Sequence, residues 1–98
     1  MKRPSSSARE AAEMLAIQAL GFIAEEPERL GAFLNATGLS VERLRESAAA
    51  PGFLAGVLEH MLGDESLLLA FATSAAIDPA EVARARNALG PQWERDVP

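Results

Sequence analysis

The sequence predicts an all-α fold, a compact bundle of about six short helices. Hydrophobic residues make up 49% of the 98 residues, and they are mostly Ala and Leu, with few β-branched residues and no Tyr. This composition favours helix over strand. Residues typical of helix starts recur along the chain, and between them apolar residues recur at spacings of three and four. Both patterns are typical of amphipathic helices.

The length of the chain fits one domain, because domains cluster near roughly 100 to 150 residues. We expect residues 1–6, which are polar and contain Pro4, to be a disordered lead-in. Residues 7–90 are predicted to form a single helical domain, and residues 91–98 to be a tail.

The first helix is predicted to begin at Ser7 and to run to about Ala24. Ser7 and Glu10 have the spacing of a capping box, in which each side chain accepts a hydrogen bond from a backbone amide of the first turn. Gly21 within this helix costs on the order of 1 kcal/mol relative to Ala. It indicates either close approach of a neighbouring helix or a tolerated defect.

Two more helices are predicted before residue 50. The second follows Pro27, which fits the first helical position, and Gly38 is placed to close it in a left-handed conformation. The third is short, with Ser40 as its cap and its end near Ala49. A fourth helix is predicted to begin after the Pro51-Gly52 break.

The stretch Ser66–Ile77 is apolar on nearly every face and is predicted to be the buried central helix, with Asp64 as its cap. A sixth helix is predicted to follow Asp78 and to end at Leu89, just before Gly90.

The chain also matches itself at a shift of 38 residues. The matched positions are apolar residues and helix starts, namely Leu20 with Leu58, Leu30 with Leu68, Ala32 with Ala70, Phe33 with Phe71, Leu39 with Ile77 and Ser40 with Asp78. This match predicts two similar three-helix units, stacked like a helical repeat. The alternative is an unrelated six-helix bundle.

Charge and composition argue against several classes of partner. A net charge of −5 and a pI near 4.8 argue against a protein that binds nucleic acid or an anionic membrane surface. The absence of Cys excludes disulfides and thiolate zinc sites, and no glycine-rich phosphate loop is present, so no cofactor is expected. Glu10 and Glu13 interrupt any signal peptide, and no apolar run is long enough to span a membrane. We expect a cytoplasmic protein.

The only histidine, His60, suggests an alternative function. It lies between Glu59 and Asp64, so a metal-dependent or acid/base enzyme that uses these three residues can be considered. No second His or Cys is available, and helix ends explain the acidic residues. We therefore expect no catalytic residue and no metal ligand.

Several short sequence features carry a resemblance to a known family: Phe33-Leu34, Gly38-Leu39, Pro51 with Phe53-Leu54, Asp64-Glu65 with Leu67-Leu68, and Phe71-Ala72. With these, the chain resembles a family of short helical proteins from alphaproteobacteria known only as a domain of unknown function. The resemblance spans roughly Glu10 to Leu89. It implies one compact helical domain and brings no catalytic residues.

The sequence favours a protein interaction module that binds a protein partner or associates with itself. The apolar surplus around Leu67 and Leu69 exceeds what neighbouring helices would cover. Trp93, the only Trp, is a residue type favoured at interaction hot spots. Leu67, Leu69 and Trp93 are therefore the predicted partner-binding residues.

Overall fold

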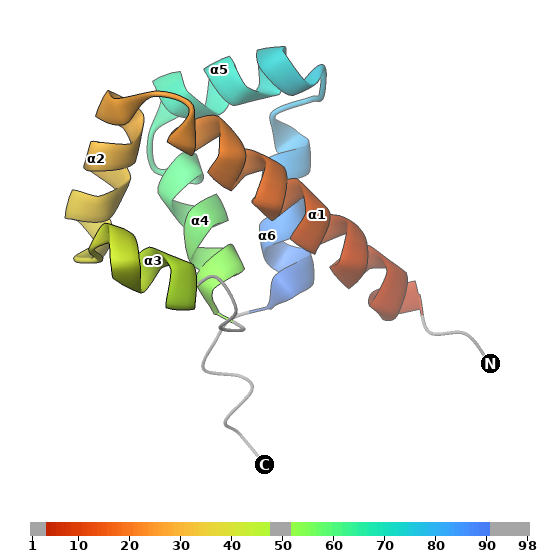
Figure 1. The fold of residues 1–98 in the computed structure, drawn as a ribbon. Helices are drawn as coiled ribbons and strands as arrows, with labels where there is room; N and C mark the ends of the chain where they lie inside the picture. Colours follow the sequence, from red (N-terminus) through yellow and green to blue (C-terminus); the bar gives the residue numbers. More distant parts are fainter. Residues whose placement is uncertain (1–3, 48–51, 91–98) are drawn as a thin grey trace.

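Six α-helices make up the chain in the computed structural model, which describes residues 4–47 and 52–90. They are α1 (Pro4–Ala24), α2 (Pro27–Thr37), α3 (Val41–Ser47), α4 (Phe53–Leu62), α5 (Glu65–Ala75) and α6 (Ala80–Leu89) (Figure 1). These two ranges contain no strand, and the prediction of an all-α bundle is confirmed. The predicted tail, residues 91–98, lies outside the described residues.

The hydrophobic core lies mainly between α1, α4 and α6, which pack against one another pairwise (Figure 1). Alanines on the inner face of α1, among them Ala16 and Ala19, are fully buried. Small side chains on this face let the long helix lie close to its neighbours. The largest fully buried side chains are Ile23, Phe33, Val57, Leu58, Met61 and Val82.

The predicted central position of Ser66–Ile77 is wrong. This segment forms α5, which lies across the end of the bundle where α4 ends and α6 begins (Figure 1). Phe71 and Ala72 face the core, but the side chain of Leu69 is 47% exposed. An apolar residue on the surface costs little enough to be common in folded proteins, so an all-round apolar helix need not be central.

Most predicted helix starts are confirmed. An Asp64 side-chain oxygen accepts a hydrogen bond from the amide of Leu67 at 3.2 Å, and Ser40 Oγ accepts one from the amide of Arg43 at the same distance. The first start is different, because α1 begins at Pro4 and Ser7 is an interior residue rather than the cap. Proline suits this position because the first turn of a helix needs no amide donor there.

The internal repeat is visible in the second helix of each unit. The bounds of α2 and α5 coincide after a shift of 38 residues. The residue after each helix, Gly38 or Ala76, is left-handed, with φ of 75° and 60°. The next amide bonds to the equivalent carbonyl in both, from Leu39 to Leu34 at 3.2 Å and from Ile77 to Ala72 at 3.0 Å. Both helices thus end in the same Schellman-type turn.

Aromatic packing relates the two units by a local pseudo-two-fold axis. Phe22 of α1 packs on Phe71 of α5 with 5.5 Å between ring centroids. His60 of α4 packs on Phe33 of α2 at 5.1 Å. At the 38-residue shift, His60 corresponds to Phe22 and Phe71 corresponds to Phe33. Exchange of the two units therefore converts one contact into the other. Such reciprocal contacts are the signature of two-fold symmetry.

The third helices of the two units pack differently. α6 lies along both α1 and α4 and buries Val82, Ala85 and Leu89. α3 contains no buried residue, and within the described chain it is not packed along α1. The repeat therefore extends over the α1–α2 and α4–α5 hairpins, while α6 closes the core and α3 contacts it only through the half-buried Leu44.

The two left-handed residues give a matched pair of stability predictions. Ala76 pays a steric penalty at φ 60°, whereas Gly38 has none at φ 75°. We expect Ala76→Gly to raise the free energy of unfolding by about 1 kcal/mol and Gly38→Ala to lower it by about as much. A Cβ at Gly38 would meet no atom within 4 Å, so its cost is conformational. Urea denaturation measures both, and a loss of stability in Ala76→Gly would contradict the assignment.

In the described ranges, no single helix combines the length and the apolar character needed to cross a membrane. One bent pair, α5 with α6, meets these two conditions jointly across a 99° bend.

Candidate functional site

The three residues of the enzyme hypothesis serve separate structural contacts. The half-buried His60 ring packs on Phe33. Asp64 caps α5, and the Glu59 carboxylate pairs with Arg86 of α6. Among the described residues no group of three His, Asp or Glu side chains is arranged to hold a metal ion. The structure thus does not bring the three together as one polar site.

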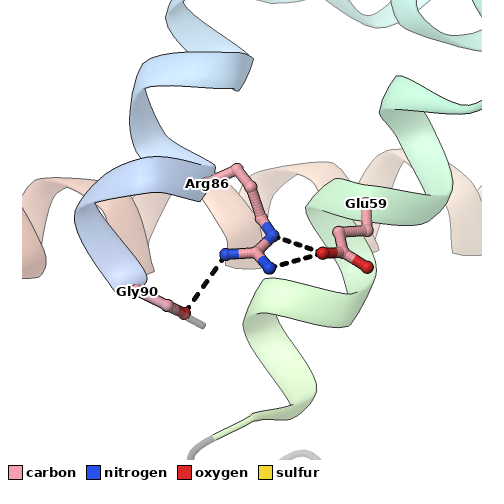
Figure 2. A network of polar contacts seen from close by, with 3 residues as sticks. All are labelled: Glu59, Arg86 and Gly90. Atoms are coloured by element: carbon pink, nitrogen blue, oxygen red, sulfur yellow. Dashed lines mark hydrogen bonds and ion pairs between the residues drawn. The ribbon is translucent and has the colours of Figure 1, made fainter. Parts of the chain in front are cut away.

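Arg86 is the centre of the main polar network (Figure 2). Its guanidinium donates to Glu59 Oε2 through both Nε, at 2.7 Å, and Nη2, and it donates through Nη1 to the carbonyl of Gly90 at 3.1 Å. The Arg86 side chain is 19% exposed, so the pair is partly shielded from water. This network joins α6 to α4 and satisfies a carbonyl at the end of α6, which is a structural role.

The predicted partner-binding residues have different environments. Leu67 of α5 is 9% exposed and belongs to the hydrophobic core. Leu69 is on the outer face of the same helix. Trp93 lies outside the described residues. Of the two predicted binding residues on α5, Leu67 and Leu69, only Leu69 is exposed enough for a partner to contact.

The largest exposed apolar side chains lie instead on α1. Met14 is 67% and Ile17 is 57% exposed, and Gly21 continues the same face. These positions, at spacings of three and four, lie opposite the buried alanines of α1. We call Met14, Ile17 and Gly21 the α1 stripe. A Cβ at Gly21 would meet no atom within 4 Å, so close approach of a helix from the same chain does not explain this glycine.

A shallow groove borders the α1 stripe on one side, with a volume of about 480 Å³ between α1 and α6. Its lining is mostly small and apolar, from Ala8, Ala11, Ala12, Met14, Leu15, Gln18, Glu81, Arg84, Ala85 and Ala88. Arg84 and Glu81 form an exposed ion pair at its edge, 3.9 Å apart. Met14 belongs to both the groove and the α1 stripe, so the two form one continuous surface.

This surface was not predicted from the sequence, because the apolar residues of each helix were assigned to a single buried face. The core pattern of α1 accounts for Ala12, Ala16 and Ala19, and Met14 and Ile17 fall outside it. A signal was available: two large apolar residues and a helix glycine share the face that should be polar.

Comparison with known proteins gives one match. The model of the family described as "Protein of unknown function (DUF3572)" matches residues 9–92. This agrees with the resemblance to a domain of unknown function over roughly Glu10 to Leu89. No curated protein and no solved structure matches the chain.

Proposed function

We propose that this chain, which belongs to the DUF3572 family of proteins of unknown function, is a protein–protein interaction module that binds through the α1 stripe. The observation that carries the proposal is the coincidence of two unfavourable features on one helix face. Met14 and Ile17 expose large apolar side chains there, and Gly21 weakens the helix without relieving a clash.

Binding of a partner helix would reverse both costs. Burial of Met14 and Ile17 recovers about 25 cal/mol for each Å² of apolar surface removed from water. A glycine on a helix surface lets a second backbone approach more closely than any other residue does. The α1–α6 groove beside the stripe adds a mostly apolar hollow of about 480 Å³ to the same surface. These features together favour recognition of a helix rather than of a small polar molecule.

A photo-crosslinking experiment in native cells tests the proposal. The photoreactive amino acid p-benzoylphenylalanine replaces Ile17 in one full-length chain and Leu69 in another, which serves as the control. We expect discrete adducts from position 17 and few from position 69, because the binding face is on α1 and not on α5. An Ile17 adduct that disappears in the presence of Gly21→Glu would confirm the stripe.

Two outcomes would contradict the proposal. The absence of any adduct at position 17 above the background of position 69 would remove the α1 stripe as a binding surface. Adducts that arise only at position 69 would return the site to the outer face of α5, where Leu69 is exposed.

We also assign the protein to the cytoplasm. The absence of Cys supports this assignment, since the chain forms no disulfide and needs no oxidising compartment to fold. Fractionation of native cells checks this, and recovery with the periplasmic or secreted fraction would contradict it.

A further inference from the structure

We infer that the α1–α6 groove is the docking site of the C-terminal segment of the same chain, residues 91–98, with the indole ring of Trp93 as its anchor. The inference goes beyond the proposed function and does not depend on it, because it concerns the groove and not the exposed face of Ile17 and Gly21. A docked indole would lie near Met14 and extend the apolar surface of the α1 stripe.

The groove is hollow because many of the side chains that line it are small. Ala8 and Ala11 of α1 are exposed, and Ala88 of α6 is half-buried. Met14 and Leu15 make the lining apolar beyond these alanines. The volume of about 480 Å³ accommodates a large side chain. Such a side chain would remove apolar surface of both helices, and its own, from water.

Residues 91–98 begin at one end of this groove. Ala88, which lines the groove, lies two residues before Gly90, the last residue that the structure describes. Arg9 Nη1 donates to the carbonyl of Leu89 at 3.3 Å, so the start of α1 lies beside the end of α6. The end of the groove that contains Ala8 and Ala88 is therefore the end nearest to the continuation of the chain.

Trp93 is close enough to Gly90 to reach the groove. Gly90 has φ 73° and ψ 159°, a conformation that is essentially restricted to glycine, and Pro91 has no amide hydrogen with which to extend α6. The three residues from Gly90 to Trp93 span at most about 10 Å. Ala85 lies about 8 Å before Gly90 along the axis of α6. The part of the groove between Ala88 and Ala85 is thus within reach of the indole.

The chemistry of the groove suits an indole. Trp93 is the largest apolar side chain of residues 91–98, and a buried aromatic ring of this kind removes about 150–250 Å² from water. The Arg84 side chain at the rim is 68% exposed, and its guanidinium can stack on the face of a Trp ring. The exposed Glu81 carboxylate is an acceptor for the indole N–H, which needs a partner when the ring is buried.

A second hollow, of about 440 Å³, is the alternative place for the indole. It lies between α2 and α4, where Phe33, Phe53 and Gly56 contribute to its lining. No residue of α6 lines it, whereas four residues of α6 line the α1–α6 groove. Because residues 91–98 leave the described chain at the end of α6, the α1–α6 groove is the favoured site.

Nuclear Overhauser contacts in the full-length chain test the position of the ring directly. Trp93 is the only Trp, so its indole protons are identified without ambiguity. We expect contacts from these protons to the methyl groups of Ala11, Ala85 or Ala88. Contacts to the Phe53 ring instead would place the indole in the second hollow and overturn the inference. An indole with no contact outside residues 91–98 would overturn it as well.

A blocking substitution tests the same contact by fluorescence. Ala11→Lys places a long charged side chain in the groove, and Ala11 is exposed, so the bundle should remain folded by circular dichroism. We expect acrylamide to quench Trp93 several-fold more strongly in Ala11→Lys than in the unaltered chain. Ala70→Lys, at an exposed alanine of α5, is the matched control and should leave quenching unchanged. Equal quenching in all three chains would contradict docking in the groove.

Dilution separates docking within one chain from docking between two. We expect the quenching of Trp93 to be independent of protein concentration, because the indole and the groove belong to the same molecule. Protection that is lost on dilution would show that the indole binds a second copy, and would overturn the inference. The proposed function fails separately: absence of adducts at position 17 would remove it and leave a docked Trp93 standing, whereas a fully quenched indole would remove this inference alone.

Discussion

Replacement of Phe33 with alanine will lower the free energy of unfolding by about 3–5 kcal/mol. Phe33 is 1% exposed and is the main inward side chain of α2. Its ring packs edge-on against Phe53, with 6.1 Å between centroids, and against His60 at 5.1 Å. The truncation therefore leaves a cavity and removes two aromatic contacts that hold α2 against α4.

This loss is large relative to the total free energy of unfolding, which is only about 5–15 kcal/mol for domains of this size. Urea denaturation followed by circular dichroism measures it. Phe33→Leu, which keeps an apolar side chain of similar reach, should cost much less and remains measurable if the alanine variant is largely unfolded. A loss below about 1 kcal/mol in Phe33→Ala would show that α2 is not held by this ring.

The internal symmetry supplies the control. Phe71 is the repeat counterpart of Phe33, is 2% exposed and packs on Phe22 across the same pseudo-axis. We expect Phe71→Ala to fall in the same range. The partners differ, because Phe22 stands where the other unit has His60, so the two values should be similar rather than identical.

Helix ends were the most predictable part of the fold. Gly38 and Asp64 act within one turn of their own positions, and their effect on the backbone does not depend on what packs nearby. The start of α1 was less predictable, because both Pro4 and Ser7 are residue types that can begin a helix.

Placement of the helices was not predictable from the apolar pattern. The pattern shows which face of a helix is buried but not which neighbour buries it. α5 has more apolar residues than its position at the end of the bundle can bury, and Leu69 is consequently exposed. α1 has fewer large ones, and its buried face consists chiefly of alanines such as Ala16 and Ala19. Close packing of these small side chains lets α1 lie against both α4 and α6.

The candidate site could not be predicted from the sequence for a related reason. Exposure of Met14 and Ile17 is a property of the whole bundle, since α6 covers one side of α1 and nothing in the described chain covers the other. A match between two repeat units was visible in the sequence. That only one of them keeps its third helix in the core could be seen only once α3 and α6 were placed.

Replacement of Leu58 with alanine will test this asymmetry, at a cost of about 2–5 kcal/mol in the free energy of unfolding. Leu58 is fully buried in α4, which has α1 on one side and α6 on the other. Its repeat counterpart, Leu20 of α1, is only half-buried. Because α1 lacks a third helix over its outer face, Leu20→Ala should cost about half as much.

Urea denaturation of the two variants gives the comparison. Equal losses at the two positions would mean that α1 and α4 are equally enclosed, which would contradict the exposure of the outer face of α1. A loss at Leu20 that is clearly smaller than at Leu58 is the expected result, since burial of an apolar side chain scales with the area that its neighbours remove from water.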